Sequence, residues 1–376
     1  MKTLLLLMSL CVLSATAPAD APRPELSLAR TAEYDYDVPE PGTYKLPVLK
    51  PAADGAVLGA DGKPIRLHDI GDGRVVILSF IYTRCTDPRA CLRASGVLKQ
   101  LQELTLAEPA LATNVVLLTL SFDPAHDTPE VMTRYGNVFS RKNGGADWLF
   151  LTTQNRDQLA PLLERYGQQV DAAKPGSASG PYNHPLRVYL IDGRKRIRNI
   201  YSYGLLDPRL VMTDVRTLMM ESAASQAMAA ARKEPLTPAE AVRKAGAICA
   251  TKFRVETAVR VTDITDKGRP SPLEVLLVDA RNDEIDTTPT ERAGIIVRIP
   301  VTALEAFAAQ SMDDLARRFE GNAVVVTGTV ETEPHPFRRD DRCENLPRPR
   351  ITVTDPSQIE IIKQPQAALR SAPSPR

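Results

Sequence analysis

Two cysteines at the end of an apolar strand are the residues of this chain best suited to chemistry. Segment 80–91 reads Phe-Ile-Tyr-Thr-Arg-Cys-Thr-Asp-Pro-Arg-Ala-Cys, so a buried-looking strand runs directly into Cys85 and Cys91, six positions apart. Thiolates are soft metal ligands, and two neighbouring thiols can also cycle to a disulfide. The pair therefore indicates metal binding or redox chemistry, without a choice between the two.

The first residues indicate the compartment in which that chemistry would occur. Lys2 precedes the apolar run from Leu4 to Leu13, and two Ala-x-Ala options follow it. This pattern is typical of a secretory signal peptide and is too short to span a bilayer. We expect cleavage after Ala19, which removes Cys11 and leaves a soluble protein that is periplasmic or otherwise extracytoplasmic.

Four cysteines remain after that cleavage. An oxidising compartment favours pairing, and four cysteines allow three connectivities. Sequence spacing groups Cys85 with Cys91, and it groups Cys249 with Cys343. We expect the second pair to form a structural disulfide.

Composition bounds the class of protein. The chain has 376 residues, of which 43% are hydrophobic, and its formal net charge is +1. This balance is that of globular material, and it lacks the basic field that nucleic-acid binding requires. The length favours two domains.

Alternating strand and helix patterns follow an exposed proline-rich arm at 20–45. We expect strands at 74–82, 114–122 and 148–151, helices at 91–104, 128–139, 155–166 and 208–231, and a hairpin at 187–201 that turns at Asp192-Gly193. Segment 74–82 is a continuous, β-rich and mainly apolar run, as expected of a strand that is covered on both faces. The order predicts an α/β domain of the thioredoxin type over 46–232.

The pattern changes to strands after a boundary near residues 232–235. We expect a capping box at Thr237, strands at 253–264, 273–279, 294–299, 323–332 and 350–354, and a helix at 302–319. Five strands with one helix suit a small, mainly-β barrel domain over 236–363 that resembles the oligonucleotide/oligosaccharide-binding (OB) fold. The proline-rich tail, 364–376, is expected to be disordered.

Three landmarks give the first domain a family resemblance. They are the strand with its cysteine pair, then Ser-Phe-Asp-Pro-Ala-His-Asp-Thr-Pro-Glu at 121–130, then His-Pro-Leu-Arg-Val-Tyr-Leu-Ile-Asp at 184–192. In this order and spacing they resemble the Sco (SenC) family over about 44–220. The resemblance implies a thioredoxin-like protein that binds copper and helps to build the copper centre of cytochrome c oxidase.

The resemblance also implies the ligands. Cys85 and Cys91 match the family's two cysteines and His184 matches its histidine, a set that can hold Cu(I) or Cu(II). We expect Cys91, at a helix N-terminus, to ionise more easily than a free cysteine. The sequence departs from the commonest family motif in having five residues instead of three between the cysteines. The longer loop can still close on a metal if it brings the two Cβ atoms within about 4.5 Å.

Simpler interpretations of these residues exist. Cys85 and Cys91 could form only a structural disulfide, and His184 could be a surface histidine before a strand. Asp123 is expected to belong to a turn with Pro124, and Asp127 to the start of a helix.

Three functions fit the sequence. The first is a copper chaperone whose partner is the copper-receiving subunit of cytochrome c oxidase or another exported cuproprotein, with membrane contact only through that partner. The second is a thiol-disulfide oxidoreductase that uses Cys85 and Cys91 as its redox pair, although the usual Cys-x-x-Cys spacing is absent. The third is an adaptor that binds a partner protein through the OB-like domain, since no basic and aromatic stripe there suits nucleic acid.

Overall fold

The computed structural model describes residues 30–140, 144–174, 176–177, 180–261, 274–279, 295–339 and 342–362. It divides into two compact units, Met1–Glu221 and Ser222–Arg376, and the division falls within a single helix. The signal peptide, the first part of the arm and the tail predicted from the sequence lie outside the described residues. Among the described residues, none of the helices has both the length and the apolar character needed to cross a membrane.

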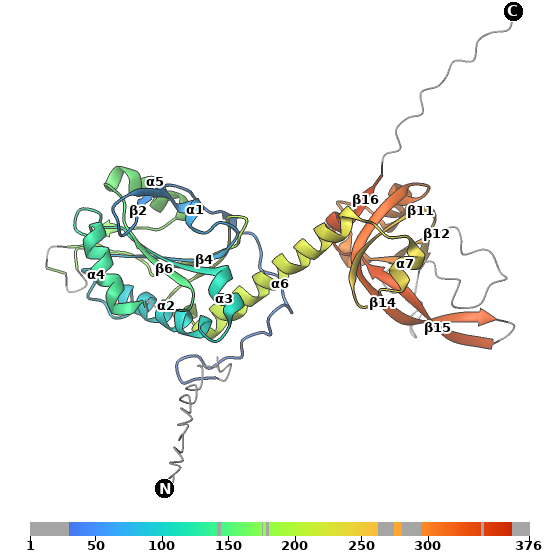
Figure 1. Ribbon diagram of the computed structural model, residues 1–376, viewed down its shortest axis with the longest axis horizontal. Coiled ribbons are helices and arrows are strands. Elements are labelled where there is room, and N and C mark those ends of the chain that lie inside the picture. The colour runs from blue at the N-terminus through green and yellow to red at the C-terminus, as the bar shows by residue number, and fades with distance from the viewer. Residues whose placement is uncertain are drawn as a thin grey trace, which may run out of the picture. The chain divides into compact units, whose positions relative to one another are not determined.

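The first unit is an α/β domain built on one six-stranded sheet (Figure 1). Its elements are β1 (Lys50–Pro51), β2 (Ala56–Leu58), β3 (Pro64–Arg66), α1 (Leu67–Ile70), β4 (Val75–Ile81), α2 (Cys91–Thr105), α3 (Pro109–Asn114), β5 (Val115–Ser121), α4 (Pro129–Phe139), β6 (Asp147–Leu151), α5 (Arg156–Tyr166), β7 (Asp171–Ala172), β8 (Tyr182–Asn183), β9 (Val188–Ile191), β10 (Arg196–Tyr201) and α6 (Pro208–Lys233). The order of strands in the sheet is β1-β10-β9-β4-β5-β6.

This sheet has the thioredoxin-like arrangement that the sequence predicts. Strands β4, β5 and β6 are parallel, whereas β9 runs antiparallel between β4 and β10. All seven residues of β4 are buried, as are all seven of β5. In Figure 1, α5 lies on one side of the sheet and α2 and α3 lie on the other. The predicted cover on both faces of the central strands is confirmed.

Two connections within this unit, the start of α4 and the turn between β9 and β10, follow from their local sequences. Thr128 caps α4 by accepting from the amide of Val131, and a proline follows at the first helical position. The Asp192-Gly193 turn is also present. Gly193 is needed there because a Cβ atom would lie 2.4 Å from the carbonyl oxygen of Gly73. The positive φ of the turn belongs to Lys195, at 61°.

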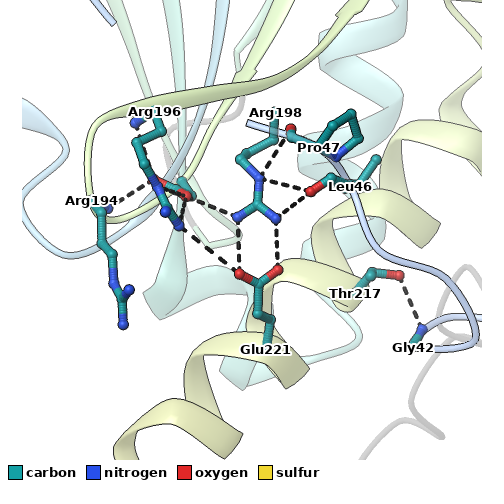
Figure 2. Close-up of polar contacts among 9 residues, drawn as sticks. Gly42, Leu46, Pro47, Arg194, Arg196, Arg198, Thr217 and Glu221 are labelled. Carbon is teal, nitrogen blue, oxygen red and sulfur yellow. Dashed lines mark hydrogen bonds and ion pairs between the residues drawn. The ribbon is translucent and has the colours of Figure 1, made fainter. Parts of the chain in front are cut away.

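The arm is held against this unit by the guanidinium of Arg198, on β10. Arg198, 4% exposed, donates to the carbonyl oxygen of Leu46 at 2.5 Å, to Asp192 at 2.9 Å and to Glu221 at 2.7 Å (Figure 2). Gly42 donates to the Thr217 hydroxyl nearby. A buried charge is tolerated only when its donors are paired, so Arg198 joins the arm, β10 and α6.

The second unit is mainly β. Its elements are α7 (Pro238–Val242), β11 (Ile248–Val261), β12 (Glu274–Asp279), β13 (Ile296–Pro300), α8 (Met312–Phe319), β14 (Ala323–Arg339), β15 (Arg342–Thr352) and β16 (Ile359–Ile361). Strands β11, β12, β13, β15 and β14 follow one another in a ring that closes because β11 also pairs with β14. The predicted separate, mainly-β domain is confirmed, and its OB-like nature stays a prediction.

Two features of this unit differ from the expectation. The α-helix predicted at 302–319 is shortened to α8, because the Ser311 side chain accepts from the amide of Asp314 and so caps a helix that begins at Met312. Strands β14 and β15 are longer than predicted, since their pairing continues through Pro334, Pro336, Pro347 and Pro349. All four occupy positions of one parity in the hairpin register, where a proline nitrogen can face away from the paired strand.

The expected Cys249–Cys343 disulfide is wrong. Cys249 is a buried free thiol, opposite Gly328 on β14, whereas Cys343 lies opposite Arg338. Ten residues of one strand, at about 3.3 Å each, separate those two positions, and a disulfide requires Cα atoms within about 7 Å. Sequence spacing could not reveal this, because the strand register sets the distance.

Replacing Arg198 tests how the arm is held. Arg198→Met removes a buried donor from Leu46, Asp192 and Glu221 and leaves the two carboxylates paired with the more exposed Arg196, so we expect the free energy of unfolding of the first unit to fall by about 3 kcal/mol. Chemical denaturation followed by the fluorescence of Trp148, the chain's single tryptophan, reports this unit alone. Arg194→Met is the control, because the Arg194 side chain extends away from the network in Figure 2. Equal stability of the two variants would contradict this account.

Candidate metal centre

The two cysteines lie where the chain leaves the central sheet. Strand β4 ends at Ile81, three residues lead from it to Cys85, and Cys91 is the first residue of α2. Parallel strands place functional loops at their carboxyl ends, and this loop follows one of the two fully buried central strands. Cys85 is 7% exposed and Cys91 is 1% exposed.

His184 lies beside the cysteine loop, just before a strand that runs antiparallel to β4. It follows β8 and precedes β9, and β9 pairs antiparallel with β4 through Val188 and Ser79. The start of one strand therefore lies beside the end of the other. The Nε2 atom of His184 lies 3.5 Å from the Sγ atom of Cys91. The three ligand atoms of Cys85, Cys91 and His184 all lie within 4.8 Å of one another.

The longer loop thus brings both thiols together with the histidine. Its turn is shaped by Asp87, whose carboxylate accepts from the amide of Arg89 and whose carbonyl accepts from the amide of Ala90. Both cysteines are free thiols in this structure. The five residues between the cysteines are the point at which the sequence departs from the commonest Sco motif. This spacing is compatible with a cluster of three ligands.

The two thiols differ in their ionisation. The hydrogen bond from the Cys91 thiol, followed by that from His184, lowers the pKa of Cys85 to about 4. Burial raises the pKa of Cys91 well above its usual range. The expectation that Cys91 ionises more easily is therefore wrong: the cost of burying a charge at Cys91 outweighs the helix N-terminus.

Aromatic rings surround the histidine. The centroid of the His184 ring lies 4.8 Å from that of Phe122 and 5.7 Å from that of Tyr82. Tyr182 packs edge-on against the same two rings. The spacing of apolar residues did not identify this cage, because its members come from three separate segments.

Asp123 and Asp127 have structural contacts. Asp127 is fully buried and accepts from the amide of Thr83 at 2.9 Å and from the hydroxyls of Thr83 and Ser121, each at 2.5 Å. Asp123 forms the expected turn, accepting from the amides of His126 and Asp127. The helix-start interpretation of Asp127 is wrong, because Thr128 is the cap and Asp127 instead joins the ends of β4 and β5.

A second group of possible ligands consists of Asp123, His126 and Asp127. The Asp127 carboxylate already accepts from Thr83, Ser121 and His126, so few lone pairs remain for a metal. His126 is exposed. The Cys85, Cys91 and His184 cluster is therefore the better candidate metal centre.

The distribution of charge between the thiols can be tested by alkylation. In reduced, metal-free protein we expect iodoacetamide to modify Cys85 before Cys91, because only Cys85 is a thiolate at neutral pH. A depressed pKa means that the thiolate forms as pH rises through about 4, so the rate at Cys85 should level off by about pH 6. Peptide mapping by mass spectrometry distinguishes the thiols.

The matched variant is Cys91→Ala, which removes the principal donor and should shift the Cys85 profile to higher pH. A rate at Cys85 that still rises between about pH 6 and pH 9, as for a free thiol, contradicts the assignment.

Comparison with known proteins agrees with these observations. The SCO1/SenC family matches residues 56–220. Copper-bound ScoI of Arabidopsis thaliana is 18% identical, and the match covers 45% of this chain and 98% of that one with a TM-score of 0.39. Apo Sco1 of Thermus thermophilus is 26% identical, with 48% and 95% of the two chains covered and a TM-score of 0.36. BsSco, described as a member of the Sco family of cytochrome c oxidase assembly proteins, is 20% identical, with 46% and 98% covered and a TM-score of 0.37.

At TM-scores below 0.5 these structural likenesses decide nothing further about this chain. No curated protein matches it closely enough to be counted as a relative. The family match covers every strand of the six-stranded sheet except β1, together with the cysteine loop and the histidine. Over residues 56–220, this chain is therefore similar to the SCO1/SenC family.

Proposed function

We propose that this chain is an exported copper-binding protein that acts as a metallochaperone in assembly of the copper centre of cytochrome c oxidase or a related cuproprotein. The observation that supports this most is the convergence of Cys85, Cys91 and His184, whose ligand atoms lie within 4.8 Å of one another. Copper is the cargo of such a protein, and its recipient is the copper-receiving subunit or another exported cuproprotein.

The chemistry of the three donors suits copper. Two sulfur ligands favour Cu(I), and an imidazole nitrogen also accepts Cu(II), so one site can hold either state. Cys85 already has a depressed pKa, which lowers the free-energy cost of forming the first thiolate. His184 is only half-buried, so one side of the cluster is accessible to a partner.

Relatives and sequence support the setting of this function. Copper is bound in the Arabidopsis thaliana ScoI structure, and BsSco is described as belonging to a family of cytochrome c oxidase assembly proteins. The predicted signal peptide at 1–19 supports an extracytoplasmic location. The family resemblance implies that the copper centres of such oxidases are assembled there.

Copper titration tests the proposal directly. Reduced protein in competition with a Cu(I) chelator should bind about one equivalent, and Cys85→Ser or His184→Ala should weaken binding at least tenfold, since each removes one ligand. His68→Ala is the control, because the His68 ring contacts Ala52 and Asp54 and belongs to neither group of possible metal ligands. Absence of Cu(I) binding by the wild-type protein would reject the chaperone function.

A second function is favoured by the acidic thiol of Cys85. In a thiol-disulfide oxidoreductase, the Cys85 thiolate attacks a partner disulfide and releases one partner thiolate. Cys91 then attacks the Cys85 sulfur, which releases the second partner thiol and leaves a Cys85–Cys91 disulfide. An external dithiol must reduce that disulfide for another cycle. Reduction of a disulfide substrate by protein that binds no copper would establish this function instead.

The second unit is proposed to act as an adaptor for a partner protein. Its strands form their own core and the metal ligands all lie in the first unit, so the two roles are separable. We expect that removing residues 236–376 leaves the Cu(I) affinity within about twofold of wild type while capture of the cuproprotein partner is lost. A large loss of copper affinity, measured by the same competition, would contradict this division.

A further inference from the structure

One buried carboxylate joins the two chain segments that carry the metal ligands. Asp123 is 2% exposed. Its Oδ2 atom accepts from Nη2 of Arg84 at 2.6 Å, and its Oδ1 atom accepts from the hydroxyl of Tyr182 at 3.2 Å. Arg84 immediately precedes Cys85, whereas Tyr182 lies two residues before His184. The contact therefore connects the cysteine loop to the histidine hairpin, β7–β8.

The histidine hairpin has little support of its own. Strands β7 and β8 pair through only two residues each, and such a short isolated hairpin is marginally stable. After His184, the side chain of Gln168 donates to the carbonyl oxygen of Pro185 at 2.9 Å. Before His184, the side-chain hydrogen bond from Tyr182 to Asp123 provides the corresponding polar anchor.

Close packing leaves little room for the hairpin to move as long as this anchor holds. A Cβ atom on Gly180 would lie 2.5 Å from the hydroxyl of Tyr82 and 3.1 Å from the carbonyl oxygen of Arg84. The rings of Tyr182 and His184 also pack against Tyr82 and Phe122. Edge-to-face ring pairs tolerate centroid separations from about 4.5 to 7 Å, whereas a hydrogen bond weakens outside a much narrower range of distance. The hydrogen bonds therefore define the position of the hairpin along the loop more closely than the ring packing does.

We propose that Arg84 and Tyr182 are positioning residues that act jointly through Asp123, holding the histidine hairpin against the cysteine loop so that His184 stays beside Cys91. Either residue alone anchors only one of the two segments to the carboxylate, so loss of either one breaks the connection through Asp123 and leaves the longer hydrogen bond from the Tyr82 hydroxyl to the Tyr182 carbonyl, at 3.5 Å, beside the ring packing. The copper-affinity test of this inference rests on the proposed function. The second test, on metal-free protein, is independent of that function.

The copper test uses the full reduced chain and Cu(I) in competition with a chelator. Arg84→Gln and Tyr182→Phe should each weaken affinity about tenfold, as loss of contacts behind metal ligands does. The double variant should also lose about tenfold, because the first change already breaks the connection. Arg89→Gln is the matched control, since Arg89 is an exposed loop arginine whose charge partner among the described residues is Asp87, at 3.6 Å. It should bind as wild type does.

Hydrogen exchange of the metal-free protein gives the second readout. The amide of Ala173 donates to the carbonyl of Pro181 across the hairpin, and it should exchange at least severalfold faster in Arg84→Gln and Tyr182→Phe. Amides of β4 should keep their wild-type protection, which shows that the unit remains folded. Faster exchange without any copper binding, even by wild type, would reject the proposed function and retain the positioning role.

Two results would overturn the positioning role. One is unchanged hairpin exchange in both single variants. The other is a loss of about a hundredfold in the double variant, the product of the single losses, which would mean that Arg84 and Tyr182 act independently.

Discussion

The buried carboxylate of Asp127 is the constraint on which the metal centre depends. It has no exposure to solvent and accepts hydrogen bonds from both the backbone and the hydroxyl of Thr83, and from Ser121. A buried charge is stable only when such donors surround it. Thr83 and Ser121 must therefore converge on one point, which fixes the direction in which the chain leaves β4 toward Cys85. Asp123, four residues earlier, extends the same arrangement toward Arg84 and Tyr182.

Burial also explains why two cysteines in one loop behave differently. Cys91 begins α2 but lies almost entirely in the core, so its uncharged thiol is favoured and can donate to Cys85. Cys85 becomes the thiolate because it receives that hydrogen bond and a second one from His184. The helix N-terminus favours negative charge within its first turn, but desolvation is the larger effect at this position. One thiolate beside one thiol suits both metal capture and disulfide exchange.

Much of the first unit could be predicted because its residues follow simple periods. Strands β4 and β5 are mainly apolar runs, α2 shows helical spacing of its apolar residues, and α4 begins at a recognisable capping threonine followed by a proline. The second unit was harder to predict. Proline is disfavoured inside paired strands, yet the hairpin of β14 and β15 contains Pro334, Pro336, Pro347 and Pro349, all at positions where the missing N–H group is not needed for the pairing. The capping serine, Ser311, divided a segment that was expected to be one helix.

By itself, the sequence determined which residues could bind a metal: Cys85, Cys91 and His184 stand at landmarks of the SCO1/SenC family. Only the tertiary structure decided how they meet, because antiparallel pairing of β9 with β4 brings His184 back to the cysteine loop. It also decided which thiol is ionised and that Cys249 is free. Those properties depend on burial and strand register, which arise from contacts between residues far apart in the chain.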